Sequence, residues 1–148
     1  MIDHFDKEYA FLSNFYPTII TENYEDVEII YPTVEHAYQA GKTLDLKTKI
    51  AISNLSSPGA AKSMGRKITL RSGWERSKVS FMKLLIYKKF EDPELREQLL
   101  NTEDEWLVEG NFWHDNFWGN CQCSKCENII GRNQLGHILM EVRNKIKK

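Results

Sequence analysis

The chain has 148 residues and a net charge of −1 at pH 7, with 41% hydrophobic and 28% charged residues. This length predicts one domain, residues 1–148, that is large enough to bury a core, and the composition is ordinary for a globular protein. The small net charge excludes a strong overall attraction to nucleic acid or to an anionic membrane, although a local basic patch stays open.

The N-terminal sequence predicts no targeting or membrane segment. Met-Ile-Asp-His-Phe-Asp lacks the basic and apolar regions of a signal peptide, and no apolar run in the chain reaches membrane-spanning length. The three cysteines lie together at Cys121, Cys123 and Cys126, whereas a disulfide framework spreads an even number along the chain. We therefore expect a cytoplasmic protein without a membrane partner. The sequence leaves the oligomeric state open.

The first third of the chain is expected to form short strands and turns, including a small antiparallel hairpin. Residues 18–21 and 27–31 are rich in β-branched side chains, and the polar segment between them suits a turn. Before them, the aromatic segment 11–17 predicts a loop that either fills the core or lines a pocket.

Helices are expected to dominate the rest. Thr33 is a good N-cap for a helix that runs to about Leu46. Further helices are predicted over residues 47–54, 59–66, 74–90, a segment after Asp92, and 134–146. Residues 105–109 could add a strand to the hairpin, and residues 110–133 are the least regular region. The predicted fold class is α+β, a helix-dominated single domain with a small antiparallel sheet.

The helix after Thr33 carries the first candidate site. Glu35, Tyr38, Gln39 and Lys42 are spaced to share one helix face. They could form a pocket wall, although a solvated face with a surface ion pair explains the same pattern. In a pocket, the glutamate would stabilise an oxocarbenium-like transition state. A lysine with a lowered pKa would attack an aldehyde carbon as a Schiff-base nucleophile.

Aromatic residues supply a second candidate site. Four of them could enclose a planar heterocycle or could pack in the core: Trp74, Trp113, Phe117 and Trp118. Gly119 directly after Trp118 favours a binding loop over core packing. Asp115 and Asn120 lie in the same loop, where either could bind a sugar hydroxyl or a base edge, and Asp115 could donate a proton.

Two further groups of residues could bind a ligand, but each also has an ordinary structural explanation. One group is basic and comprises Lys62, Arg66, Lys67, Arg71 and Arg76. Arg66 could bind a phosphate, but a solvated surface explains the group equally well. The other is Cys121-x-Cys123-x-x-Cys126, which could bind zinc with His114 or His137. A second Cys-x-x-Cys pair is missing, so reduced thiols or a redox role stay open. We expect no cofactor and no metal, with zinc at these cysteines and His114 as the alternative.

Seven motifs occur in one order along nearly the whole chain. They are Phe11-Leu-Ser-Asn-Phe15, Pro32-Thr-Val-Glu-His36 with Gln39-Ala-Gly-Lys42, Ser57-Pro58 with Met64-Gly-Arg66, Trp74, Phe117-Trp-Gly119, Gly131-Arg-Asn-Gln-Leu-Gly136 and Leu139-Met-Glu-Val-Arg143. In these motifs the sequence resembles the NADAR superfamily, named for NAD and ADP-ribose, which includes the YbiA-like N-glycosidases.

The resemblance implies a helix-rich α+β fold and hydrolysis of the bond between a base and a phosphorylated ribose. It implies either ADP-ribose attached to guanine in nucleic acid or ribosylamino-pyrimidine intermediates of riboflavin synthesis as the substrate. It also implies catalysis by Glu35, Schiff-base capture of the opened ribose by Lys42, and base stacking by Trp74 and Trp118. Further substrate-binding residues are expected within or beside the matching motifs: Asn14, Phe15, Gln39, Arg66, Gly119, Asn120 and Asn133.

The sequence departs from the family pattern after Trp118-Gly119, where YbiA-like members typically have an aspartate and this chain has Asn120. An asparagine cannot act as a general acid, so Asp115 becomes the candidate proton donor. We expect removal of ADP-ribose from guanine in DNA, with Glu35 and Lys42 facing one pocket with the two tryptophans. A non-catalytic ADP-ribose or nucleotide-binding module and a small zinc-dependent interaction domain are the alternatives.

Overall fold

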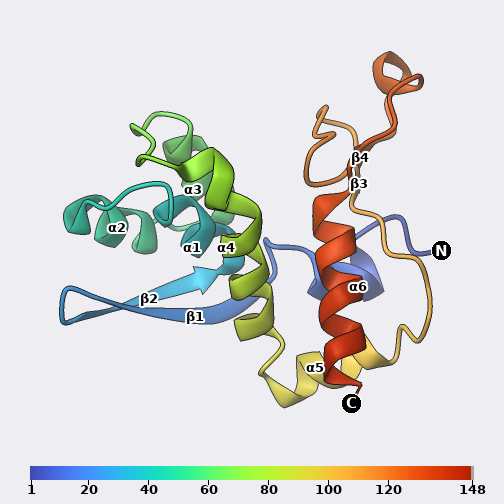
Figure 1. Ribbon diagram of the computed structural model, residues 1–148, viewed down its shortest axis with the longest axis horizontal. Helices are drawn as coiled ribbons and strands as arrows, with labels where there is room; N and C mark the ends of the chain where they lie inside the picture. The colour runs from blue at the N-terminus through green and yellow to red at the C-terminus, as the bar shows by residue number, and fades with distance from the viewer. Residues whose placement is uncertain (148) are drawn as a thin grey trace. The chain divides into compact units, whose positions relative to one another are not determined.

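The computed structural model describes residues 1–147, and Lys148 lies outside them. The chain forms two compact units (Figure 1). The hairpin unit comprises residues 14–89. The C-terminal unit comprises residues 1–13 together with the chain from Phe90 onward.

The predicted hairpin is confirmed and is longer than expected. Strand β1 (Pro17–Tyr24) pairs antiparallel with β2 (Val27–Thr33). Glu25 and Asp26 form the turn, and both have positive φ angles, of 49° and 64°. Two successive left-handed residues match the right-handed twist of the strands that they join.

Helix α1 (Val34–Ala40) begins where the sequence predicts, because the Thr33 hydroxyl accepts the His36 backbone N–H at 3.1 Å. The expected extension to Leu46 is wrong, since the helix ends at Ala40. The interpretation of its polar face as solvated is also wrong. All residues of α1 are buried, because α1 contacts both strands and helices α2 (Leu46–Ser53), α3 (Pro58–Gly65) and α4 (Trp74–Lys89) (Figure 1).

The other helices of the hairpin unit follow local signals in the sequence. Ser57 caps α3 by accepting the Ala60 backbone N–H, and Pro58 occupies the first helical turn. Along α4, Met82, Leu85 and Ile86 are buried, and Phe81 is half-buried.

The C-terminal unit contains the short helices η1 (Lys7–Leu12) and η2 (Ser124–Cys126) and the helices α5 (Pro93–Leu100) and α6 (Gln134–Ile146). Its parallel ladder joins β3 (Gly110–Asn111) to β4 (Asn120–Cys121). The strand expected over 105–109 is wrong, since Leu107 makes only an isolated bridge to Ile2. The α+β class is confirmed, and no helix of the described chain is long and apolar enough to span a membrane.

Candidate functional site

Five polar residues on and around α1 form a connected group, here called the α1 cluster: Asn14, Glu35, Gln39, Lys42 and Arg71. The Glu35 backbone N–H donates to the Asn14 carbonyl at 3.1 Å, and the Arg71 N–H donates to the Lys42 carbonyl at 2.7 Å. The Gln39 amide donates to the Glu35 carboxylate at 2.5 Å. The backbone therefore brings residues from three separate stretches of the hairpin unit to one helix.

Glu35 lies inside the protein, with only 8% of its surface exposed. A buried carboxylate is costly unless it is paired or hydrogen-bonded, and Gln39, one helical turn later, supplies a hydrogen bond. Gly65 on α3 leaves the space that Gln39 needs, because a Cβ atom at this position would collide with the Gln39 side chain. The orientation of Glu35 thus depends on the close packing of α3 against α1.

Lys42 follows α1 in the chain and is half-buried. Its Nζ lies 3.5 Å from the Gly65 carbonyl oxygen and 5.9 Å from the centre of the Tyr38 ring. Burial lowers the pKa of the Lys42 ammonium, Glu35 partly opposes this effect, and the positive charges of Lys78 and Arg66 add to it. A lowered pKa increases the fraction of neutral amine, which is the nucleophilic form.

The α1 cluster also contains buried polar atoms that the protein does not satisfy. Asn14 Oδ1, Gln39 Oε1 and Arg71 Nε have no hydrogen-bond partner among the described residues. Buried polar atoms are nearly always paired in folded proteins, so each exception needs a cause, such as a water molecule or a ligand. The α1 cluster thus has two acceptors and one donor that the described residues leave unused, as a binding site would.

Trp74 and Arg66 lie in different surroundings. Trp74 is 3% exposed, and its ring centroid is 5.2 Å from that of Tyr38 and 5.5 Å from the Arg71 guanidinium. It supports the cluster from within the core, and its stacking on a base stays a prediction. Arg66 is exposed at the C-cap of α3, where a phosphate can reach it. Phe15 is also exposed, at 43%.

In the C-terminal unit, Asp115 and Trp118 belong to a loop that is tied to its own backbone. Asp115 Oδ1 accepts the backbone N–H groups of Phe117 at 3.1 Å and Trp118 at 2.9 Å. The Trp118 carbonyl accepts the Leu135 N–H at 3.0 Å, at the start of α6. These contacts give Asp115 a role in shaping the loop. Its role as a proton donor and the stacking by Trp118 stay predictions.

Gly119, Asn120 and Asn133 make similar contacts to the backbone. Asn120 Oδ1 accepts the Gly131 N–H at 2.7 Å. Asn133 uses both ends of its amide, accepting from the Glu109 N–H and donating to the Leu107 carbonyl, each at 2.9 Å. Gly119 is buried, with no room for a Cβ atom beside Glu109. Substrate binding by these three residues stays a prediction.

The sequence left the choice between His114 and His137 open, and the structure groups His114 with the three cysteines. His137 instead packs its ring against Trp106, with the ring centroids 5.6 Å apart.

Arg71 is the functional candidate that the sequence placed only in a general basic group. The spacing of residues along the chain could not show that the Arg71 guanidinium lies against the Trp74 ring.

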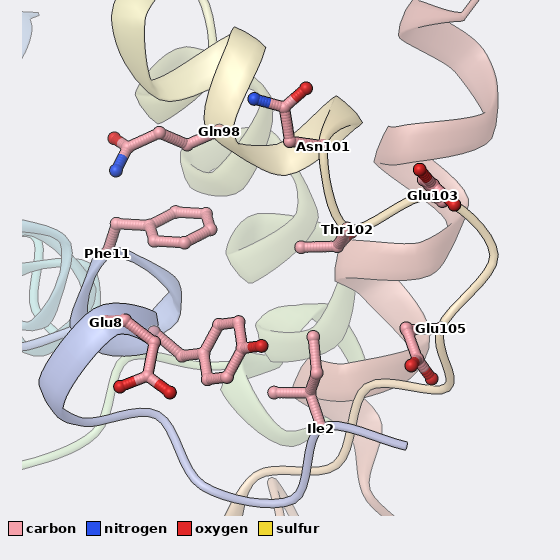
Figure 2. Close-up of a pocket in the computed structure, with 9 residues that line it drawn as sticks. Ile2, Glu8, Phe11, Gln98, Asn101, Thr102, Glu103 and Glu105 are labelled. Carbon is pink, nitrogen blue, oxygen red and sulfur yellow. The ribbon is translucent and has the colours of Figure 1, made fainter.

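A pocket of about 410 Å³ lies elsewhere in the C-terminal unit. Figure 2 shows it between η1 and the segment after α5, with Ile2 and Phe11 among its apolar residues and Glu8, Glu103 and Glu105 among its acidic ones. Glu105 is paired with the N-terminal amine of Met1 at 2.6 Å. This pocket contains none of the predicted catalytic or binding residues.

Comparison with known proteins identifies the family. The sequence matches the NADAR domain over residues 2–147. The chain belongs to the NADAR domain family. It is 40% identical to the N-glycosidase YbiA of Escherichia coli over 119 residues, covering 78% of this chain and 71% of that protein. An N-glycosidase of Nostoc punctiforme is 39% identical over 147 residues, covering 95% of this chain and 88% of the relative.

The solved structure of Escherichia coli YbiA has the same fold, with a TM-score of 0.78 and 35% identity over 99% of this chain and 85% of that one. A riboflavin biosynthesis protein of Vibrio vulnificus is 32% identical over 97% of this chain but only 37% of its own length. The predicted membership of the NADAR superfamily is therefore confirmed. As a member of the YbiA-like N-glycosidase family, the chain is a hydrolase of N-glycosyl bonds.

Proposed function

We propose that this NADAR protein removes ADP-ribose from guanine in DNA by hydrolysing the bond between ribose C1 and the base. One observation carries the proposal: a buried carboxylate oriented by Gln39 lies in the same cluster as a lysine whose pKa is lowered by burial. This combination suits a reaction in which positive charge develops at a sugar carbon and an amine then attacks that carbon.

The chemistry follows from these two side chains. The ribose ring opens as the C1–O4′ bond breaks, the base nitrogen shares its lone pair with C1, and O4′ takes a proton from solvent. Glu35 stabilises the cation that forms at C1. The neutral amine of Lys42 adds to C1, the bond from C1 to the base breaks, and the base leaves with a proton. Water then hydrolyses the Lys42 Schiff base, which releases ADP-ribose and regenerates the amine.

Neighbouring residues support substrate binding. Arg66 is exposed, and the field of its charge acts on Lys42, so it is suited to hold a phosphate beside the reacting sugar. The unsatisfied Asn14 Oδ1 and Gln39 Oε1 can accept hydrogen bonds from ribose hydroxyls. A modified base in a single strand requires only a local binding groove, which is compatible with the net charge of −1.

The test is incubation with single-stranded DNA that carries ADP-ribosyl guanine, followed by measurement of free ADP-ribose. A phosphorylated ribosylamino-pyrimidine is tested in parallel, because some NADAR relatives are riboflavin biosynthesis proteins. Release from DNA at the higher kcat/KM supports the proposal. Faster cleavage of the pyrimidine would replace the substrate, and binding of ADP-ribose without any cleavage would favour the non-catalytic module.

The lysine step has a test of its own. Borohydride reduction during turnover is expected to leave a stable adduct on Lys42, located by mass spectrometry. Activity without an adduct would instead indicate direct attack by water on the cation held by Glu35.

Since the neutral amine reacts, kcat/KM should rise with pH, and burial should place this rise below the ordinary lysine pKa of about 10.4.

A further inference from the structure

Four potential metal ligands converge in the C-terminal unit: His114, Cys121, Cys123 and Cys126. Their ligand atoms all lie within 4.8 Å of one another. All three cysteines are free thiols, and Cys121 and Cys126 are buried. Three thiols and one imidazole around a single point match the composition of a structural zinc site.

The distances fit a tetrahedral site of this type. His114 Nδ1 lies 3.3 Å from the Cys123 sulfur, 3.4 Å from the Cys126 sulfur and 3.8 Å from the Cys121 sulfur. With Zn–S bonds of about 2.3 Å and a Zn–N bond of about 2.0 Å, a regular tetrahedron has N···S edges of about 3.5 Å. The imidazole nitrogen is therefore already at the separation from each sulfur that a shared zinc ion requires.

The backbone places each cysteine by local structure. Cys123 and Cys126 lie at the two ends of the turn formed by η2, which brings residues three apart onto the same side. The Cys126 N–H donates to the Cys123 carbonyl at 3.1 Å. Cys121 is in β4, where it pairs with Asn111 of β3. The third thiol is thus fixed by the ladder and not by the turn.

His114 is held in an unfavourable conformation that turns its ring toward the sulfurs. Its φ is 69°, in the left-handed region that non-glycine residues seldom occupy. The buried Asn111 side chain holds this turn by accepting the Trp113 and Asp115 N–H groups, at 3.3 and 3.1 Å, and by donating to the Asp115 carbonyl at 2.8 Å. Backbone strain that neighbouring residues maintain tends to mark a functional position.

Asn116 provides the outer contacts that metal sites typically have. Its amide nitrogen lies 3.5 Å from the Cys126 sulfur, and its side-chain oxygen accepts the Cys121 N–H at 2.9 Å. An N–H donor at a sulfur offsets the negative charge of a thiolate.

We propose that His114, Cys121, Cys123 and Cys126 bind one Zn²⁺ ion, which holds the loop between β3 and η2 in place. The three thiols lose their protons on binding, so the site with neutral His114 has a net charge of −1 and binding releases protons to solvent. All four positions of the tetrahedron are taken by protein, which leaves no open position for water or substrate. The site is therefore structural and lies outside the hydrolytic chemistry proposed for the α1 cluster.

The test is metal analysis of the full chain, produced with added zinc and purified without a chelating resin or chelator. We expect one zinc per chain, a lower Tm after treatment with a strong chelator, and recovery of the Tm on adding Zn²⁺ alone. Substitution with Co²⁺ should give the visible absorption bands of a tetrahedral cobalt–thiolate complex. Metal-free protein with three reduced thiols, or with a disulfide in the cluster, would overturn the proposal.

A matched pair of histidine variants separates the site from general effects. His114→Ala should lower the zinc affinity by at least about tenfold. His137→Ala, also an exposed histidine of the C-terminal unit, should keep one zinc per chain. If Cys126→Ser does not fold, zinc release from the wild-type protein on thiol modification still decides the question. Equal zinc affinities of the two histidine variants would remove His114 from the site.

Discussion

The α1 cluster and the loop 115–120 both gather polar residues, but they use them in opposite ways. In the loop, Asp115 and Asn120 bond to backbone N–H groups, so their side chains shape the chain itself. In the α1 cluster, Asn14 Oδ1 and Gln39 Oε1 are buried and find no hydrogen-bond partner in residues 1–147. Atoms that already bond to the backbone serve the fold, whereas buried atoms without a partner need a cause such as a water molecule or a ligand.

The largest effect that would test this comparison is expected at Glu35. Glu35→Gln removes the negative charge opposite the developing sugar cation, so kcat/KM should fall by about 10³-fold. The measurement is ADP-ribose release under single-turnover conditions. Glu28→Gln, at an exposed glutamate of β2, should be near wild type. A loss of less than tenfold at Glu35 would move the catalytic centre away from α1.

The second effect concerns the space that Gly65 provides. Gly65→Ala would push a methyl group into the Gln39 side chain and displace its hydrogen bond to Glu35. A misplaced catalytic group can cost about 10²-fold in rate, so we expect a loss of 10- to 100-fold in kcat and a lower Tm.

Gly59→Ala is the matched control for Gly65→Ala, because it lies on the same helix and its added Cβ meets only Ser57 Oγ, at 3.9 Å. This variant should retain activity and gain slightly in helix stability. Equal activity of the two alanine variants would contradict the role of Gly65 in positioning Gln39.

The sequence predicted helices well where caps and periodicity act locally. Thr33, Ser57 and Asp92 each cap the helix expected at that point, and α6 has the predicted bounds. The sequence could not show that α1 is buried on every side, because this burial depends on how α2, α3, α4 and the hairpin pack around α1, and residue spacing does not reveal that packing. The same packing defines the α1 cluster, and it is why Arg71 was not singled out.

Family motifs predicted catalytic roles for Glu35 and Lys42, whereas periodicity alone left them as a possible surface pair. Motifs do not show how a side chain is used, however. Asn133 lies in a family motif and was expected to bind substrate, yet both ends of its amide bond to the backbone. The extent of a single domain over residues 1–148 likewise stays a prediction.

The third effect distinguishes the two possible roles of Asn133. Asn133→Ala leaves the Glu109 N–H and the Leu107 carbonyl unpaired and places alanine at a φ of 50°, so it should lower stability by about 2–4 kcal/mol. Denaturant unfolding measures this change, with Asn144→Ala on the exposed face of α6 as the control. A role in positioning the sugar instead predicts unchanged stability and a higher KM.

The smallest effect tests whether burying a charged side chain outside the α1 cluster lowers the stability of the hairpin unit. Lys89 is 1% exposed, and burial lowers its pKa to about 7. In the unfolded chain, a lysine retains its proton up to a pKa of about 10.4. Between these values the unfolded state binds more protons than the folded state, so this group makes stability rise with pH. Below about pH 7 its destabilising effect is fully present and no longer changes.

Lys89→Met should therefore raise the Tm at pH 7 by a few degrees and make the rise in Tm between pH 7 and 10 shallower than in the wild type. Lys47→Met, at an exposed position of α2, provides the matched control and should leave this slope unchanged. Thermal unfolding across the pH range measures both slopes. If Lys89→Met keeps the wild-type slope, the buried ammonium is compensated within the fold. The cost in stability of burying polar groups would then fall on the unsatisfied atoms of the α1 cluster and not on Lys89.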